Sequence, residues 1–165
     1  MLVFDATPLI YLAKTGCIEC LRQLDEEKVI PEKVYEEVVE KGNERGAIDA
    51  KKIEKEVNKG VFEIVSERVD STSDALSQAD LQVLKIAENL DATVVMDETA
   101  GRNAATARGV ETRGTAFIIL TLQKKKILTR EQAENTLNQM IDAGWYCSTD
   151  LYKEILEKIK EIDKD

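Results

Sequence analysis

The feature that most constrains this sequence is a pair of short apolar runs that each end on an aspartate. Leu2 to Phe4 leads into Asp5, and Thr93 to Met96 leads into Asp97. Runs this short and this apolar are typical of strands that are buried on both faces, as in a parallel sheet. Ligands of open parallel sheets bind beyond the carboxyl ends of the strands, which is where both aspartates stand. The sequence therefore places two carboxylates where α/β proteins perform chemistry.

The segment before the second run predicts an amphipathic helix that starts at the same edge of the sheet. Ser77 is a suitable N-cap, and Asp80 three residues later completes an S-x-x-D capping arrangement. The apolar residues that follow recur at helical spacing, at Val83, Leu84, Ala87 and Leu90. Because this helix runs back to feed the strand at 93–96, its N-terminus and Asp80 lie near the strand ends.

The rest of the chain alternates short strands with helices. We expect further strands at 28–30, 61–65 and 110–112, and helices at 32–41, 47–59, 100–108, 115–123, 130–142 and 151–162. A polar loop, expected to be mobile, covers 70–74. This alternation predicts an α/β fold, a three-layer sandwich with a small parallel sheet flanked by helices. We expect one domain over 1–165, with 129–165 as a C-terminal helical extension.

The composition removes several kinds of site. The chain has no histidine, which excludes Ser-His-Asp and Cys-His nucleophilic sites and every histidine-ligated metal centre. Its three cysteines are an odd number, which argues against a disulfide framework. The net charge of −9 argues against a broad basic surface for nucleic acid. No apolar run approaches the length of a membrane span, so we expect a cytoplasmic protein that does not bind membranes.

Three acids at one sheet edge repel one another, and that repulsion destabilises the fold. A bound divalent cation would offset it, and carboxylate oxygens suit Mg²⁺ or Mn²⁺. Each acid also has a plain structural interpretation: Asp5 and Asp97 as turn residues, and Asp80 as a capping acid. If repulsion dominates, Asp97→Asn should keep or raise the stability of the metal-free protein.

The order of these motifs resembles the PIN domain family. The matching segments are the opening from Asp5 to Ile10, Pro31 to Val38, Leu76 to Leu81, and Asp97 to Ala105 followed by Arg113-Gly114-Thr115. The resemblance covers most of the chain and is greatest to VapC-like single-domain prokaryotic and archaeal members. It implies a magnesium- or manganese-dependent ribonuclease whose acidic quartet matches Asp5, Glu37, Asp80 and Asp97, with Asp5, Asp80 and Asp97 as metal ligands.

Helical periodicity alone leaves Glu36 and Glu37 equivalent, since they flank the apolar stripe of their helix symmetrically; only the resemblance selects Glu37. Glu98 is a further candidate beside Asp97. The resemblance also matches Thr7 and Thr115 to hydroxyl positions near the metal, although either could simply cap a helix. Arg102 and Arg113 could contact RNA phosphates, and Lys14 with 124–126 could extend a narrow basic strip.

The expected function is thus a metal-dependent endoribonuclease, either the toxin of a toxin–antitoxin pair or an RNA-processing nuclease. The alternative is a PIN-like module that binds RNA or protein without cleaving. A phosphatase with Asp5 as nucleophile would need a second aspartate at position 7, where Thr7 stands. A small antitoxin is a possible partner. A homodimer is expected because the helix at 115–123 is apolar nearly all round.

Overall fold

The computed structural model describes residues 1–70 and 75–165 and contains a parallel sheet. In the described residues five strands follow the order β3-β2-β1-β4-β5, and each neighbouring pair is parallel. The strands are β1 (Leu2–Phe4), β2 (Lys28–Pro31), β3 (Glu63–Val65), β4 (Thr93–Val95) and β5 (Thr112–Arg113). The expected α/β fold with a small parallel sheet is confirmed.

The order in which the chain adds strands to the sheet reverses between β1 and β4, although the strands themselves are parallel. From β1 the chain adds β2 and β3 on one side, and it then returns to place β4 and β5 on the other. Phe4 pairs with Val95, and the amide of Asp5 donates a hydrogen bond of 3.0 Å to the carbonyl of Val95. The carboxyl ends of β1 and β4 therefore lie side by side, at the type of switch point where α/β proteins bind ligands.

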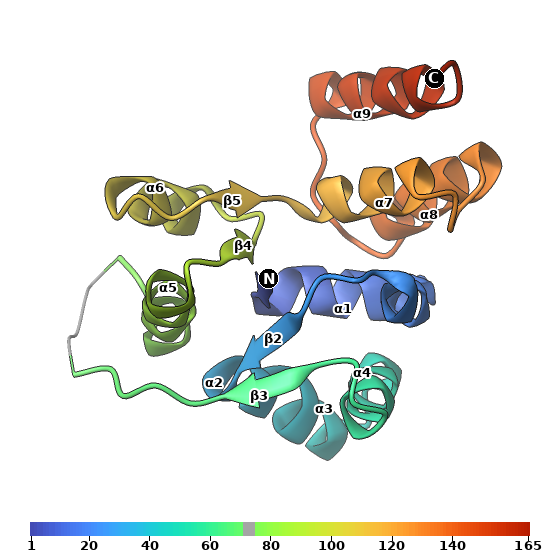
Figure 1. The fold of residues 1–165 in the computed structure, drawn as a ribbon. Helices are drawn as coiled ribbons and strands as arrows, with labels where there is room; N and C mark the ends of the chain where they lie inside the picture. Colours follow the sequence, from blue (N-terminus) through green and yellow to red (C-terminus); the bar gives the residue numbers. More distant parts are fainter. Residues whose placement is uncertain (71–74) are drawn as a thin grey trace.

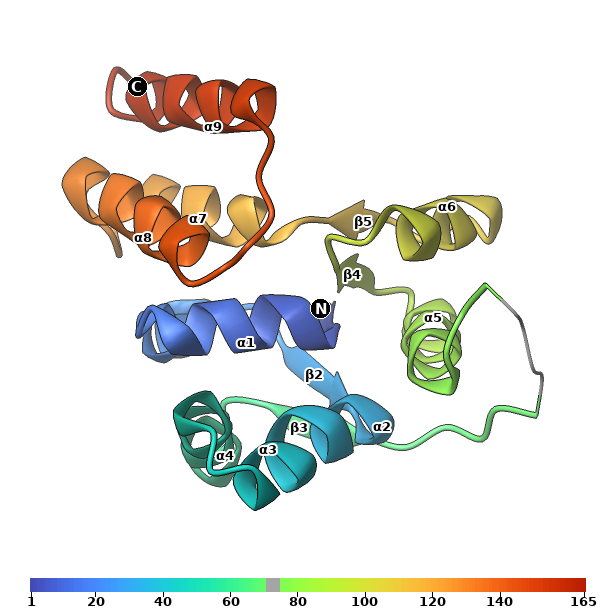
Figure 2. The same cartoon turned by 180° about the vertical axis from the view of Figure 1, so that it is seen from behind.

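Helices cover both sides of the sheet. Figures 1 and 2 show α5 and α6 on one side of the strands, and α1, α4, α7 and α8 on the other. The helical segments are α1 (Ala6–Lys14), the 3₁₀ segment η1 (Cys17–Gln23), α2 (Glu32–Tyr35), the π-helical segment η2 (Glu36–Glu40), α3 (Lys41–Glu44), α4 (Ile48–Asn58), α5 (Gln78–Leu90), α6 (Thr99–Ala107), α7 (Thr115–Lys124), α8 (Arg130–Asp142) and α9 (Thr149–Ile162).

The core forms where the central strands meet these helices. Val3, Phe4, Val94 and Val95 have no exposed surface, so β1 and β4 are covered on both faces. The ring of Phe4 also meets Phe62 edge to face, with centroids 5.6 Å apart, next to the edge strand β3. Two uninterrupted apolar strands are buried because their parallel sheet has helices on each side.

Capping residues set the start of several helices. Ser77 caps α5, and its side chain and that of Asp80 form the expected reciprocal box. Thr129 and Gln132 form a second box at the start of α8. Ser148 caps α9 through the amide of Leu151. These side chains satisfy amides that have no partner inside the helix.

Element ends and one helix differ from the prediction. The helix expected at 32–41 consists of α2, η2 and α3, with a π-helical stretch in the middle. β3 begins two residues later than expected, at Glu63, and β5 begins at Thr112. Strand ends shift in this way because the pairing partner, rather than the residue type, decides where a ladder stops. The loop expected at 70–74 lies outside the described residues from position 71 onward.

The apolar helix α7 packs mainly within the fold. It contacts α8 and α9, and Ile118, Ile119 and Leu122 are fully buried. The C-terminal helices therefore cover much of the surface that made α7 look like an interface. Across the described parts of the chain, no helix is both long and apolar enough to cross a bilayer.

Candidate acidic site at the carboxyl edge of the sheet

Asp5 is the most perturbed acid of this edge. It follows β1 directly and is only 7% exposed. Burial raises the pKa of its carboxyl from the ordinary 3.8 to about 7; the Ala6 amide opposes this shift, and the charges of Asp80, Glu37 and Glu98 add to it. A carboxyl in such surroundings favours either a proton or a cation beside it.

Glu37 lies in the π-helical segment η2 and is exposed. Its charge acts on Asp5, whereas the neighbouring Glu36 is not among the groups that shift the Asp5 pKa. The buried residues Val38 and Val39 hold the other side of the segment in the core. Single π turns often occur at functional sites, because the extra residue changes where the following side chains point. The structure thus separates two glutamates that helical periodicity treats alike.

Asp80 combines the two interpretations that its sequence allows. Its Oδ2 accepts the Ser77 amide at 3.0 Å, while its own amide donates to Ser77 Oγ at 3.1 Å. Its charge also raises the pKa of Asp5. The capping box fixes Asp80 at the first turn of α5, and the contact of α5 with β1, β2 and β4 places that turn at the acidic edge.

The carboxylates suit a hard divalent cation in chemistry but are not closed around one. All are oxygen donors, and no lysine or arginine is among the groups that shift Asp5. Over the residues that the structure describes, however, no three acidic side chains are close enough together to form a ligand set. Both observations hold, because charges interact over longer distances than metal–ligand bonds span. Glu37 and Glu98 are exposed, so their side chains can turn toward Asp5.

Asp97 has different surroundings from Asp5. Its Oδ1 accepts the Thr115 amide at 2.8 Å, and its Oδ2 accepts Thr115 Oγ1 at 2.6 Å and the Trp145 indole Nε1 at 3.1 Å. Thr115 is the first residue of α7, so Asp97 provides a carboxylate at a helix N-terminus whose own N-cap is Gly114. A Cβ at Gly114 would lie 3.0 Å from Asp97 Oδ1, so the glycine makes the close approach possible.

Trp145 belongs to this site, although the sequence reasoning did not select it. It is 5% exposed and lies in the loop between α8 and α9. The available signal was chemical: a tryptophan that is buried needs an acceptor for its indole N–H, and carboxylates are strong acceptors. Which carboxylate it would reach depends on how α8 and α9 fold back, and no local pattern encodes that.

The other expected site residues are distributed more widely. Thr115 is fully buried against Asp97, and Thr7 is half-buried in the first turn of α1. Arg102 is exposed on α6, and its Nη1 would be 3.7 Å from a Cβ at Gly114, beside Asp97. In the described residues it has no carboxylate partner.

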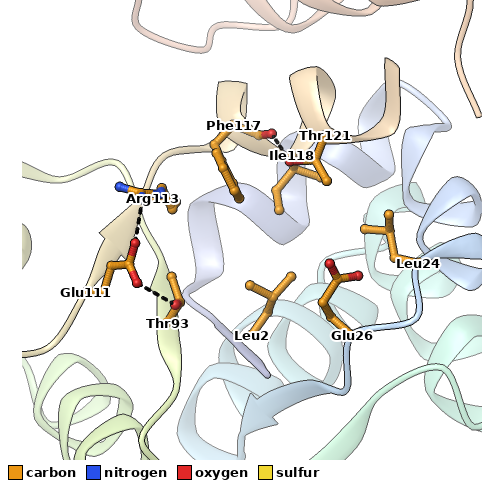
Figure 3. A pocket seen from close by; sticks show the side chains of 9 residues that line it. All are labelled: Leu2, Leu24, Glu26, Thr93, Glu111, Arg113, Phe117, Ile118 and Thr121. Atoms are coloured by element: carbon orange, nitrogen blue, oxygen red, sulfur yellow. Dashed lines mark hydrogen bonds and ion pairs between the residues drawn. The ribbon is translucent and has the colours of Figure 1, made fainter. Parts of the chain in front are cut away.

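Arg113 points into a different pocket. It pairs with Glu111 at 2.5 Å and lies 5.3 Å from the centre of the Phe117 ring. Figure 3 shows both contacts around a cavity of about 140 Å³ that Leu2 and Thr93 also line. These two residues begin β1 and β4, so this pocket lies at the opposite edge of the sheet from Asp5. This pocket is therefore not the acidic site.

Two lysines of the expected basic strip contact other side chains. Lys14 lies 5.4 Å from the ring centre of Tyr11, within its own helix. Lys125 is 3.7 Å from Asp25 and 3.4 Å from Glu26, near the start of β2. That these cations form a path for RNA phosphates stays a prediction.

Comparisons with known proteins agree with this architecture. A family model described as "PIN domain" matches residues 1–161. A search of curated proteins gave no match. A solved structure, "a domain of a functionally unknown protein from Methanocaldococcus jannaschii DSM 2661", is similar with a TM-score of 0.50 and 22% sequence identity, over 68% of this chain and 89% of that one. That likeness concerns the fold alone. Because the family match extends from the first strand into the last helix, the chain belongs to the PIN domain family.

Proposed function

We propose that this PIN domain is a divalent-metal-dependent endoribonuclease whose site is the acidic edge of the sheet. PIN domains have a nuclease-type fold, and the family match supports that class. The observation that carries the proposal is the buried Asp5, whose pKa is raised by burial and by the charges of Asp80, Glu37 and Glu98. Such an arrangement is unfavourable without a cation and useful with one.

In this proposal Asp5, Glu37 and Asp80 hold Mg²⁺ or Mn²⁺. When bound, the ion lowers the pKa of water and stabilises the charge that develops at a phosphodiester. Asp5 provides the fixed ligand because β1 and Val95 hold its backbone, and Asp80 is fixed by the capping box. Glu37 is the exposed, adjustable ligand, and its movement toward Asp5 closes the site.

We assign Asp97 a supporting role rather than a place as a primary ligand. A carboxylate has roughly four acceptor positions, and three donors occupy three of the four on Asp97. It orients Thr115 and the N-terminus of α7 beside the acids. Arg102, which lies near Asp97, is the cation best placed to contact a phosphate.

The test is cleavage of a panel of single-stranded RNAs with Mg²⁺, with Mn²⁺ and with a chelator. Wild-type protein should cut only with metal, and Asp5→Asn and Glu37→Gln should lose cleavage. Glu36→Gln is the matched control, because it removes the same charge one residue away and should keep activity. Equal activity in the two glutamate variants would refute the assignment of Glu37.

A second candidate function is a module that binds RNA or protein without cutting it. The observation in its favour is that, within the described ranges, the acids are not closed into a ligand set. Calorimetric titration with Mn²⁺ separates the two functions. A cleaving site should bind Mn²⁺ in wild-type protein and lose that binding in Asp5→Asn. A module that does not cleave should show no Mn²⁺ binding in either protein.

We also propose, from the family resemblance, a homodimer and the role of a toxin with a small antitoxin partner. Phe117 on α7 is 37% exposed, which leaves part of this helix available to a second copy. Sedimentation at micromolar concentration tests the dimer, and a single species near 18.5 kDa would exclude it. Growth arrest on expression of wild-type protein, absent with Asp5→Asn, would support the toxin role.

A further inference from the structure

The loop between α8 and α9, residues 143–148, is attached to the acidic edge. Trp145 in this loop donates its indole N–H to Asp97. The C-terminal helices are therefore connected to the proposed nuclease site through a hydrogen bond from a buried side chain. Whatever the loop exposes next to Trp145 lies near the place where RNA would be cut.

Tyr146 is what the loop exposes. It is 86% exposed, more than any other large hydrophobic side chain in the described residues, whereas Trp145 before it is buried and Cys147 after it is half-buried. Single exposed hydrophobic residues are ordinary on protein surfaces. The position of Tyr146 is not ordinary, because the preceding residue contacts Asp97.

The backbone on both sides of Tyr146 is held in place. The Trp145 amide donates to Met140 at 2.9 Å, and the Gly144 amide donates to Ile141 at 3.0 Å. On the other side, Ser148 accepts the Leu151 amide at 3.1 Å and so starts α9. Tyr146 thus projects from an anchored loop. A ligand that binds its ring does not have to order the loop, so binding costs less conformational entropy than it would on a free segment.

The net charge of the protein indicates what kind of contact this ring would make with a ligand. The protein has a net charge of −9, so its surface as a whole repels RNA. Arg113 and Lys125 already face carboxylates, which reduces the number of cations available for phosphates. Stacking of a base on an aromatic ring needs no charge and tolerates any sequence. An acidic nuclease therefore has a particular need for a stacking contact.

We propose that Tyr146 is a stacking platform for one nucleobase of a single-stranded RNA that lies along the acidic edge. Trp145 is the positioning residue that fixes the platform against Asp97. The choice of RNA as the ligand rests on the proposed nuclease function. The platform itself is a separate claim about binding.

The experiment measures the affinity of a fluorescent oligoribonucleotide by anisotropy, with chelator present so that no strand is cut. Tyr146→Ala should weaken binding roughly 5- to 150-fold, as the loss of one base–aromatic stack does. Tyr146→Phe keeps the ring and should stay within about twofold of wild type. Ile48→Ala, which removes a 73% exposed side chain on α4, is the control for loss of exposed apolar surface.

An abasic strand of the same length provides the decisive comparison. It keeps the phosphates but has no base to stack, so wild type and Tyr146→Ala should bind it equally. Equal binding of the complete strand by these two proteins would overturn the proposal, as would wild-type protein that fails to prefer the complete strand over the abasic one. A Tyr146→Ala effect on sedimentation without an effect on RNA affinity would overturn it too, in favour of a contact between copies.

Cleavage with Mn²⁺ separates this proposal from the proposed function. If wild type does not cut but the stacking differences hold, the nuclease assignment fails and the platform stands. If wild type cuts and Tyr146→Ala has the same KM and RNA affinity, the platform fails and the nuclease stands. Where both hold, Tyr146→Ala should raise KM and leave kcat within a few-fold.

Discussion

Asp5 and Asp97 end neighbouring strands of one sheet, yet their surroundings are opposite. Asp5 is buried, and its neighbours Asp80, Glu37 and Glu98 carry the same charge. Asp97 is half-buried and accepts three hydrogen bonds from Thr115 and Trp145. Burial and like charges disfavour the ionised form of Asp5, whereas both carboxylate oxygens of Asp97 accept hydrogen bonds. The same residue type at equivalent strand ends can therefore have opposite electrostatic surroundings.

The largest effect should come from removing the Asp5 charge. Asp5→Asn should reduce metal-dependent cleavage by about 10³-fold or more, because it removes the fixed ligand of the proposed site. The metal-free protein should remain folded, which circular dichroism can verify. Asp25→Asn, an exposed aspartate before β2, is the control and should retain activity. Residual cleavage above a tenth of the wild-type rate would place the metal elsewhere.

The stability of the metal-free protein should depend on pH through Asp5. Its folded pKa of about 7 exceeds the ordinary 3.8, so between these values the folded state binds more protons than the unfolded state. Stability should therefore fall as pH rises from about 4 to 7, by up to about 4 kcal/mol for this group. Urea unfolding across this range measures the slope, which Asp5→Asn should flatten.

Metal should act against this trend, since the ion replaces the proton on Asp5. With saturating Mn²⁺, the stability of wild-type protein should rise rather than fall toward pH 7. An identical pH profile in wild type and Asp5→Asn would show that Asp5 titrates normally, and the contrast with Asp97 would then disappear.

Removing the Asp97 carboxylate should instead destabilise the fold directly. Asp97→Ala leaves the buried Thr115 hydroxyl and the Trp145 indole without their acceptor. We expect a loss of about 2 to 4 kcal/mol in the free energy of unfolding, measured in urea without metal. Glu98→Ala, at the next position and exposed, should change it by less than about 0.5 kcal/mol. Unchanged stability in Asp97→Ala would mean that the three hydrogen bonds to Asp97 make no net contribution to the free energy of unfolding.

The smallest effect should come from the indole hydrogen bond alone. Trp145→Phe keeps an aromatic ring in the buried position but removes the donor to Asp97, which should lower stability by about 1 kcal/mol. Trp145 is the only tryptophan, so the variant has no tryptophan fluorescence to follow. The melting temperature should therefore be measured by circular dichroism. A loss as large as that of Asp97→Ala would indicate that packing of the indole, rather than its hydrogen bond, holds the loop.

Asp97 also shows where reasoning from sequence reaches its limit. Repulsion among clustered acids predicts that Asp97→Asn keeps or raises the stability of the metal-free protein, whereas the three hydrogen bonds to Asp97 lead us to expect a loss of stability when its acceptors are removed. The donors that satisfy Asp97 come from positions 115 and 145, far along the chain. Glu37 is the converse case: periodicity leaves it equivalent to Glu36, but only the charge of Glu37 is among those that raise the pKa of Asp5. Neither outcome is encoded in a local pattern.

The sequence by itself determined the layers of this protein, because burial patterns and capping signals act over a few residues. Apolar runs at 2–4 and 93–96 specify central parallel strands, Ser77 specifies the start of α5, and the lack of histidine excludes every histidine-dependent site. Tertiary structure alone decided the surroundings of each acid. A carboxylate's pKa and partners depend on charges and donors that folding brings together from distant segments, and the loop that carries Trp145 and Tyr146 reaches Asp97 only once α8 and α9 have packed on α7.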